Sequence, residues 1–324
     1  MGMSAQHQYF YSTEHLLLSF TIVCVSILAM LGNGVVLTAF LLYKQLRKQQ
    51  CCYLIAALAL CDFVTGFGMF TGYSGLIYYQ FTYSSYNAFN CMIIGVPVPV
   101  GLLSGQALTV AIAWDRIQAF WQPAKYRRKN HRKFAVKALS FALSFALCFT
   151  AAFFLFADLD RTPSTCTVAD SAPKILSALF GVLNLSLSFT VLLFYLLALC
   201  LMQRQVKEAR EDAEKARLLK RQMKVTKTIF TVLFVFVMFW VVPNVSFLFT
   251  FSLLSPDVLL RASPLINLSA LINSGANPVV YAAKHGTIRK YMLAVLKGKR
   301  NHVAQDTGSL RYAQQQSRNN VEMK

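Results

Sequence analysis

The sequence is poor in charged residues, and acidic residues are the scarcest of them. Only 14% of its 324 residues are charged, with 13 Asp and Glu against 32 Lys and Arg. A soluble domain has about 25% charged residues. Hydrophobic residues make up 56% of the chain, so there is too little polar surface for a water-soluble globule. The shortage of charge predicts a membrane protein.

Stretches that lack Lys, Arg, Asp and Glu are long enough to cross a bilayer. About 20 apolar residues span the hydrocarbon, and such a segment must be helical because no water satisfies its backbone. One stretch, 63–114, is too long for one span, and its polar-aromatic middle (78–90) predicts a loop. We expect an all-α membrane protein, a seven-transmembrane helix bundle. Its spans are predicted at about 15–43, 53–78, 91–118, 134–157, 175–203, 226–252 and 262–283.

The connections between these spans alternate between basic segments and segments that have almost no Lys or Arg. Of the 32 Lys and Arg, 29 lie in four segments on one side. Lys and Arg accumulate on the cytoplasmic side of membranes, so we expect the N-terminus outside. The net charge of +19 then reflects topology and faces anionic inner-leaflet lipid; it does not indicate a nucleic-acid partner. The four basic segments are 44–52, 115–137, 203–227 and 284–324.

The chain lacks internal repeats and a soluble appendage. After the last span, apolar residues such as Ile288 and Tyr291 share one face opposite basic residues, which predicts an amphipathic helix on the membrane surface. The Gln-, Asn- and Ser-rich end is typical of disorder. The expected parts are a short extracellular N-terminus (1–14), a transmembrane domain (15–283), an amphipathic helix (284–297) and a disordered cytoplasmic tail (298–324).

Cysteines that would face the oxidising side are few. Of eight, only Cys91 and Cys166 are predicted to lie there. A disulfide between them would join the second outer loop to the outer end of the third span; two free thiols are the alternative. Cys51 and Cys52 would face the cytoplasm, where reversible acylation is an option.

Asp62 is the only carboxylate deep within a predicted span. A charge there costs about 2.5–3.5 kcal/mol on insertion scales, so Asp62 needs polar partners or water. We interpret it as part of a polar core with Asn33, Asn273 and Asn277. A surface Asp at a misplaced span boundary is the alternative.

Two further features lie toward the inner ends of spans. Pro278 in NPVVY (277–281) removes a backbone hydrogen bond and is expected to kink the last span, so that Tyr281 can move with the kink. Asp115 and Arg116 stand side by side where the third span leaves the membrane. Asp115 gives Arg116 a partner there; ordinary interfacial snorkelling is the alternative interpretation.

Together these motifs resemble the rhodopsin-like (class A) G-protein-coupled receptors along nearly the whole chain. Two stretches, AWDRIQAFWQPAKYR and NPVVYAAKHGTIRKY, are most similar to nematode serpentine chemoreceptors of the Srsx class. The matching features are GN at 32–33, LALCD at 58–62, Cys91 placed 25 residues before Arg116, DR at 115–116 with Pro123 and KYR at 125–127, and NPVVY at 277–281.

The resemblance implies a receptor without enzymatic activity or a cofactor. Such a receptor binds an extracellular ligand at the plasma membrane and activates a heterotrimeric G protein, and arrestin would contact its tail. The Srsx class implies a chemosensory role and a sensory cilium. In the family the Arg is held by its Asp at rest and turns toward the G protein and Tyr residues on activation. That assigns the activation switch to Asp115, Arg116 and Tyr281.

Two departures from the family pattern concern the predicted sites. Gly105 replaces a Ser of the family's ion site, so a sodium ion near Asp62 would have one oxygen ligand fewer. Pro243 follows Trp240 by three residues where the family has two, which questions the role of Trp240 as an activation toggle.

The outer halves of the spans suggest a ligand class. Val98 stands where amine receptors have Asp, which argues against a monoamine, and Leu271 replaces the Lys that binds retinal. The outer part of the third span (95–106) is uncharged, and such walls suit a small neutral or apolar ligand. The outer loops are mildly acidic, so a basic peptide as ligand, and hence a neuropeptide-type receptor, is the alternative. The pocket candidates are Val98, Gln106, Phe236, Trp240 and Phe247.

Other classes of membrane protein fit less well. A seven-span transporter or channel is expected to have several ionisable residues along a pathway or repeat symmetry, and only Asp62 qualifies. A membrane enzyme would need a constellation of His, Asp or Glu within a span. The ordered motifs favour a receptor.

Overall fold

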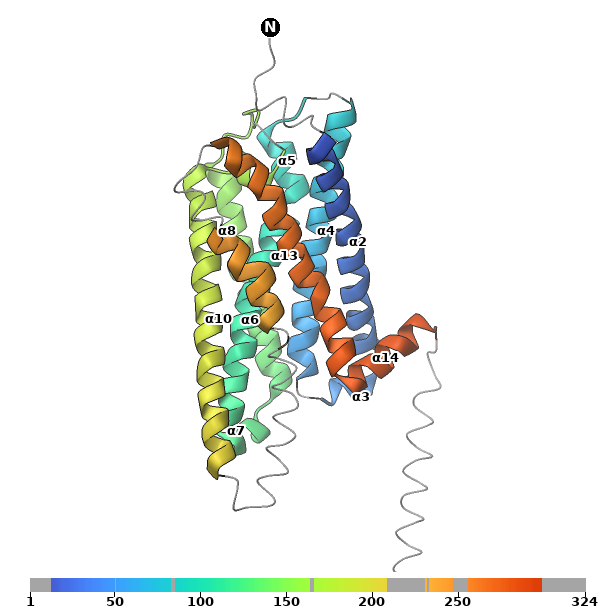
Figure 1. Cartoon of the computed structure of the whole chain (residues 1–324), viewed down its shortest axis with the longest axis vertical. Coiled ribbons are helices and arrows are strands. Elements are labelled where there is room, and N and C mark those ends of the chain that lie inside the picture. Colours follow the sequence, from blue (N-terminus) through green and yellow to red (C-terminus); the bar gives the residue numbers. More distant parts are fainter. Residues whose placement is uncertain are drawn as a thin grey trace, which may run out of the picture.

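The computed structural model describes residues 13–49, 51–82, 85–163, 166–208, 231, 233–246 and 256–298. Every regular element in these ranges is helical, and the long helices run side by side as a bundle (Figure 1). Five helices are long and apolar enough to cross a membrane, and an apolar helical segment covers Leu233–Ser246. The long helices are α2 (Thr13–Leu42), α4 (Cys52–Thr82), α6 (Pro97–Trp121), α8 (His131–Phe156), α10 (Lys174–Glu208) and α13 (Pro256–Lys284).

The predicted third span is built from two consecutive helices. A short helix, α5 (Ala88–Gly95), begins at Asn87, whose side chain accepts a hydrogen bond from the Asn90 amide at 3.0 Å. Helix α6 starts at Pro97, where the missing N–H is tolerated. Val96 between them has helical dihedral angles, so the two helices follow one another with little change of direction.

The predicted loop at 78–90 is shorter in the structure. Helix α4 continues to Thr82, and α5 already begins at Ala88. The aromatic residues here pack on one another, since the Tyr79 and Tyr86 rings lie 5.2 Å apart. Gln80 is buried as well. Because these side chains have packing partners, the segment extends the helix by about one turn where its polarity suggested a loop.

Helix α6 passes through the middle of the bundle and packs against α4, α8 and α10. Its approach to α4 is very close at Gly101. A Cβ atom there would lie 2.6 Å from the Thr65 backbone nitrogen, so only glycine fits. Small residues at such crossings let membrane helices approach one another, and this one fixes the position of α6.

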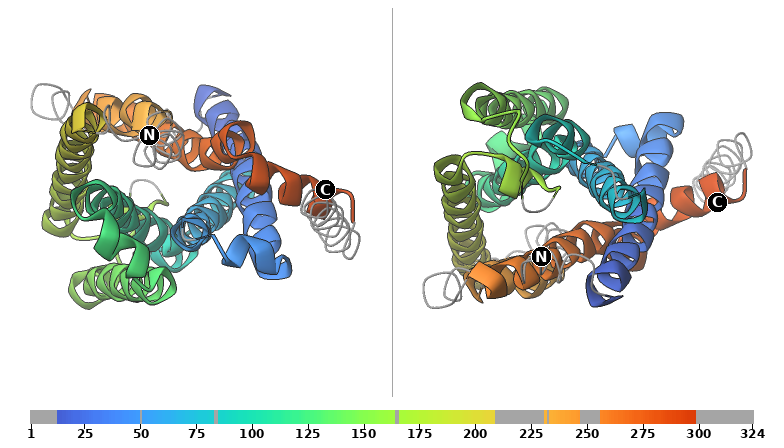
Figure 2. Two further views of the ribbon diagram at one scale, coloured as in Figure 1. Left: turned by 90° about the horizontal axis from the view of Figure 1, so that it is seen from below. Right: turned by 90° about the horizontal axis from the view of Figure 1, so that it is seen from above.

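The two ends of the bundle differ. The basic helices α3 (Lys44–Arg47), α7 (Pro123–Arg128) and α14 (Gly286–Leu296) lie at one end, and α5 lies at the other (Figure 1). Helix α14 buries Tyr291 against Tyr43 of the α2–α3 junction, with ring centroids 4.6 Å apart. End-on views show α14 leaving the bundle on the side opposite α10 (Figure 2).

Candidate functional site

A disulfide joins Cys91 of α5 to Cys166, which precedes the short helix α9 (Val168–Ser171). Both cysteines are buried. The backbone adds to the link, because the Ala88 amide donates to the Arg161 carbonyl at 2.8 Å. The connection after α8 is therefore fastened to the start of α5, at the end away from the basic helices.

The helical segment Leu233–Ser246 contains a π-helical turn, η2 (Val237–Val241). A π turn takes up one residue more than an α turn. That extra residue accounts for the unusual spacing of Trp240 and Pro243. Trp240 remains buried, and its indole Nε1 donates to Ser188 Oγ of α10 at 3.1 Å.

The polar core forms between α4 and α13. Asn277 Nδ2 donates to Asp62 Oδ2 at 2.8 Å, and both residues are buried. Asp62, Asn273 and Asn277 line one small cavity together with Gln106. The oxygen Oε1 of Gln106 is buried and has no hydrogen-bond partner among the described residues.

Asn33 lies beside this cavity but does not line it. Its Nδ2 donates to the backbone carbonyls of Ala29 at 3.0 Å and Ser274 at 3.2 Å. The neighbouring Gly32 allows this contact, since a Cβ there would lie 3.2 Å from Pro278 Cγ. Asn33 is thus buried next to the polar core, where its amide joins α2 to α13.

The pocket candidates fall in two places. Gln106, Phe236 and Trp240 line the Asp62 cavity. Val98 does not: its backbone packs on α4, where a Cβ at Gly68 would meet the Val98 nitrogen at 2.5 Å. Val98 is therefore a packing residue of the α4–α6 contact. Phe247 lies outside the described residues.

Asp115 and Arg116 form a buried ion pair at the basic end of α6. Arg116 Nη2 lies 2.6 Å from Asp115 Oδ2, and the two residues are 9% and 1% exposed. The Tyr126 hydroxyl donates to the same oxygen at 2.8 Å. Lys129 Nζ donates to Asp115 Oδ1 at 3.2 Å, and His131 Nδ1 lies 3.8 Å from that oxygen. Asp115 thus holds several donors at once.

Tyr126 and Lys129 were not assigned from the sequence, although Tyr126 lies in the KYR motif. They reach Asp115 because α7 turns back under α6 after Gln122. Burial raises the pKa of Tyr126, with Asp115 adding to the effect and Arg116 opposing it. Tyr126 therefore stays a protonated donor. Burial lowers the pKa of Lys129, and Asp115 opposes that shift.

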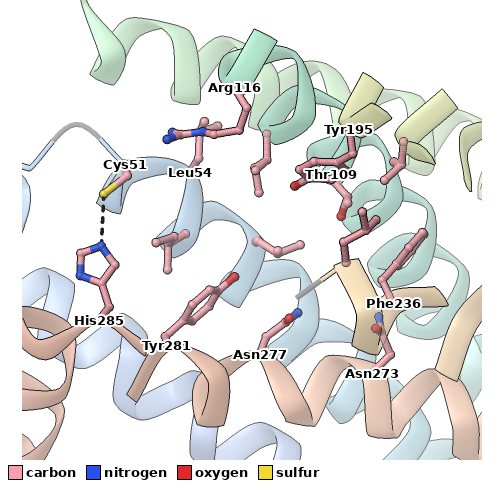
Figure 3. A pocket seen from close by; sticks show the side chains of 15 residues that line it. Cys51, Leu54, Thr109, Arg116, Tyr195, Phe236, Asn273, Asn277, Tyr281 and His285 are labelled. Atoms are coloured by element: carbon pink, nitrogen blue, oxygen red, sulfur yellow. Dashed lines mark hydrogen bonds between the residues drawn. The ribbon is translucent and has the colours of Figure 1, made fainter. Parts of the chain in front are cut away.

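Arg116 also lines a second cavity at this end (Figure 3). Tyr281 of α13 points into it from the opposite wall, and Tyr195 of α10 and Cys51 border it. Among the described residues, no hydrogen bond links Arg116 to Tyr281. Phe236, Asn273 and Asn277 line this cavity and the Asp62 cavity alike, so the two share a wall. The arrangement connects the middle of the bundle with its basic end.

The comparison with protein families decides the class. Residues 32–281 match the family described as 7 transmembrane receptor (rhodopsin family). The chain belongs to the rhodopsin-like family of seven-transmembrane receptors. It is a multi-pass membrane protein of a family of receptors, not of enzymes, and family membership implies coupling to a G protein. Among curated proteins, no individual match to this receptor was found.

Proposed function

We propose that this receptor binds an extracellular ligand and activates a heterotrimeric G protein, with Asp115, Arg116 and Tyr281 as the switch. The observation that carries the proposal is the position of Arg116. It is tied to Asp115 at 2.6 Å and to the Tyr126 hydroxyl at 3.4 Å, and it borders a cavity opposite Tyr281. A group entering that cavity reaches the guanidinium directly.

The contacts around Asp115 set the resting state. Hydrogen bonds to charged groups contribute about 1.5–3 kcal/mol each when buried. A G-protein helix that offers Arg116 new acceptors replaces part of this energy, and Tyr281 and Tyr195 lie where they can join the new arrangement. A shift from 1:99 to 99:1 needs about 5.5 kcal/mol of differential binding. Rearranging two or three such contacts is of that size.

The ligand remains a small neutral or apolar molecule in this proposal. The uncharged outer part of the third span (95–106) supports it. The alternative is a basic peptide, and hence a neuropeptide-type receptor, supported by Asp158, Asp160 and Asp170 in the outer connection. The similarity to Srsx sequences supports a chemosensory receptor in the plasma membrane of a sensory cilium. A transporter or channel is the remaining candidate.

Sodium is a candidate ligand of the Asp62 cavity. Sodium is a hard cation and prefers oxygen ligands, as Ca²⁺ and Mg²⁺ do. Asp62 would supply the carboxylate, and the unpartnered Gln106 Oε1 would supply the oxygen missing at Gly105. Such an ion would neutralise Asp62 within the bundle.

Further partners follow from the two ends of the chain. Residues 1–14 are proposed to be extracellular and 15–283 to form the receptor domain. The segment 284–297, which contains α14, is proposed to lie on inner-leaflet lipid. Most of the tail, 298–324, lies outside the described residues and is proposed to contact arrestin.

Nucleotide exchange tests the switch. The full chain is reconstituted in nanodiscs with purified G proteins of each class, and binding of a GTP analogue is measured with and without Arg116→Ala. We expect exchange by the wild type and its loss in the variant. Arg127→Ala, which removes an exposed Arg from α7, is the matched control. Wild-type exchange rates in a normally folded Arg116→Ala receptor would overturn the proposal.

A further inference from the structure

Cys51 borders the Arg116 cavity and takes no part in the Asp115 contacts. It directly precedes α4 and is partly exposed. Its Sγ lies 3.8 Å from Nε2 of His285, which lies between α13 and α14 (Figure 3). Two segments far apart in sequence thus place a thiol and an imidazole at the edge of one cavity.

This pairing makes the thiol a nucleophile. An imidazole within hydrogen-bond reach of a thiol removes its proton, and the thiolate is the reactive form. Arg116 is a buried cation that lines the same cavity, and a nearby positive charge favours the thiolate form. These contacts favour a reactive thiol.

Two other uses of this thiol fit poorly. A disulfide between Cys51 and Cys52 would require adjacent Cα atoms about 3.8 Å apart to meet a bond that needs about 4.4–6.8 Å. A metal site would need further ligands, and the described residues contain no group of three His, Cys, Asp or Glu able to hold an ion. Cys52 is buried, and its thiol donates to Gln49 Oε1 at 3.6 Å.

The cavity itself indicates the reagent. Its walls are mostly aliphatic, with Leu54, Ile55 and Ile112 near Cys51 and Arg116. Arg116 Nε is buried and without a hydrogen-bond partner among the described residues. An apolar chain that ends in a carbonyl oxygen matches both the aliphatic wall and this free donor.

We propose that Cys51 is a covalent modification site for apolar α,β-unsaturated carbonyl compounds, and that the adduct closes the Arg116 cavity. The Cys51 sulfur forms a bond to the β-carbon as the carbon–carbon double bond opens. The negative charge passes to the carbonyl oxygen, where His285 and Arg116 stabilise it. The thiol proton, taken up by His285, ends on the α-carbon. Nothing is oxidised or reduced, and no group leaves.

The consequence for signalling depends on the proposed coupling to a G protein, whereas the chemistry at Cys51 does not. The two are therefore measured separately. The full-length receptor in nanodiscs is treated with trans-2-nonenal, adducts are fixed by borohydride reduction, and modification at each cysteine is followed by mass spectrometry. Nucleotide exchange is recorded in parallel, before and after treatment, for the wild type and for Cys51→Ser.

We expect Cys51 to react at least about tenfold faster than free N-acetylcysteine at the same pH, because a larger fraction is thiolate. His285→Gln should slow Cys51 by about tenfold. The exposed thiols Cys148 and Cys200 lie on membrane-spanning helices and report only the partitioning of the reagent into lipid. A wild-type Cys51 that reacts no faster than N-acetylcysteine would overturn the site even where His285→Gln fails to fold.

The second readout concerns closure of the cavity. We expect treatment to reduce nucleotide exchange in the wild type in proportion to adduct formation. In Cys51→Ser, the exchange rate after treatment divided by the rate before treatment should stay near one. Full modification with undiminished exchange would overturn the closure and keep the site. Absence of exchange before any treatment would instead count against the proposed coupling to a G protein.

Discussion

The Tyr126 hydroxyl and the Arg116 guanidinium bind the same oxygen of Asp115, at 2.8 and 2.6 Å. The tyrosine comes from α7 and the arginine from α6, so the connection after α6 takes part in restraining the arginine. The restraint is therefore larger than the neighbouring Asp alone provides. Lys129 binds the other carboxylate oxygen and helps to hold Asp115 in place.

Removing the Tyr126 hydroxyl should release Arg116 in part. We expect Tyr126→Phe to raise ligand-free nucleotide exchange at least about tenfold, because a hydrogen bond to a charged group, about 1.5–3 kcal/mol, leaves the resting state. GTP-analogue binding at equal receptor density measures this. Tyr78→Phe, at an exposed position on α4, should change nothing. Unchanged or lower exchange in Tyr126→Phe would assign the hydroxyl to loop stability alone.

Sodium should stabilise the receptor through Asp62. We compare the midpoint of thermal unfolding in sodium chloride and in choline chloride at equal ionic strength. Sodium at tenfold excess over its Kd should add about 1.4 kcal/mol. The difference should vanish in Asp62→Asn and shrink in Gln106→Leu, whose lost oxygen faces the same cavity. Equal midpoints in the two salts for the wild type would refute the ion site.

Ser269 supports the helical segment that carries Trp240. Pro243 cannot donate to the Phe239 carbonyl four residues earlier, and Ser269 Oγ of α13 donates to that carbonyl at 2.6 Å instead. We expect Ser269→Ala to lower the free energy of unfolding by about 0.5–1.5 kcal/mol. Ser186→Ala is the control, since among the described residues that hydroxyl donates to the Val182 carbonyl of its own helix. Equal losses in both variants would contradict this role.

The α4–α6 crossing should not tolerate a methyl group. Gly101→Ala places a Cβ 2.6 Å from the Thr65 nitrogen, and overpacking of this kind costs about 1–3 kcal/mol. Thermal unfolding should show the loss, together with reduced delivery to the cell surface. Gly72→Ala on α4 meets nothing within 4 Å and should be neutral. A Gly101→Ala receptor as stable as Gly72→Ala would show that the helices can separate without cost.

The sequence predicted the helical membrane bundle well because the absence of charge over long stretches is a strong signal. It was weaker wherever a contact depends on two helices at once. Val98 was proposed as a pocket residue from its uncharged surroundings, whereas the close approach of its backbone to Gly68 depends on a second helix and could not be read from the sequence. Asn33 was assigned to the polar core around Asp62 because both are polar residues within predicted spans. Its contacts with the Ala29 and Ser274 carbonyls depend on how α2 packs against α13 and could not be read from the sequence.

The contacts around Asp115 show the same limit of prediction from sequence. Asp115 and Arg116 could be paired from their adjacency alone, whereas Lys129 and His131 reach Asp115 through the path of the chain around α7. No periodicity encodes that path. Likewise Cys51 and His285 are 234 residues apart, and only the folded bundle makes them neighbours.

The π turn at Val237–Val241 has a consequence for comparing this receptor with its relatives. One residue added to a continuous α-helix would rotate everything beyond it by about 100°, whereas the π turn takes up the added residue, so that the helix beyond it keeps the register of a relative that lacks the residue. A relative with a Trp–Pro spacing of two therefore corresponds to this chain residue for residue up to Trp240, and with an offset of one from Pro243 outward. Mutations that change ligand selectivity in such a relative must be transferred with that offset on the outer side of the sixth span.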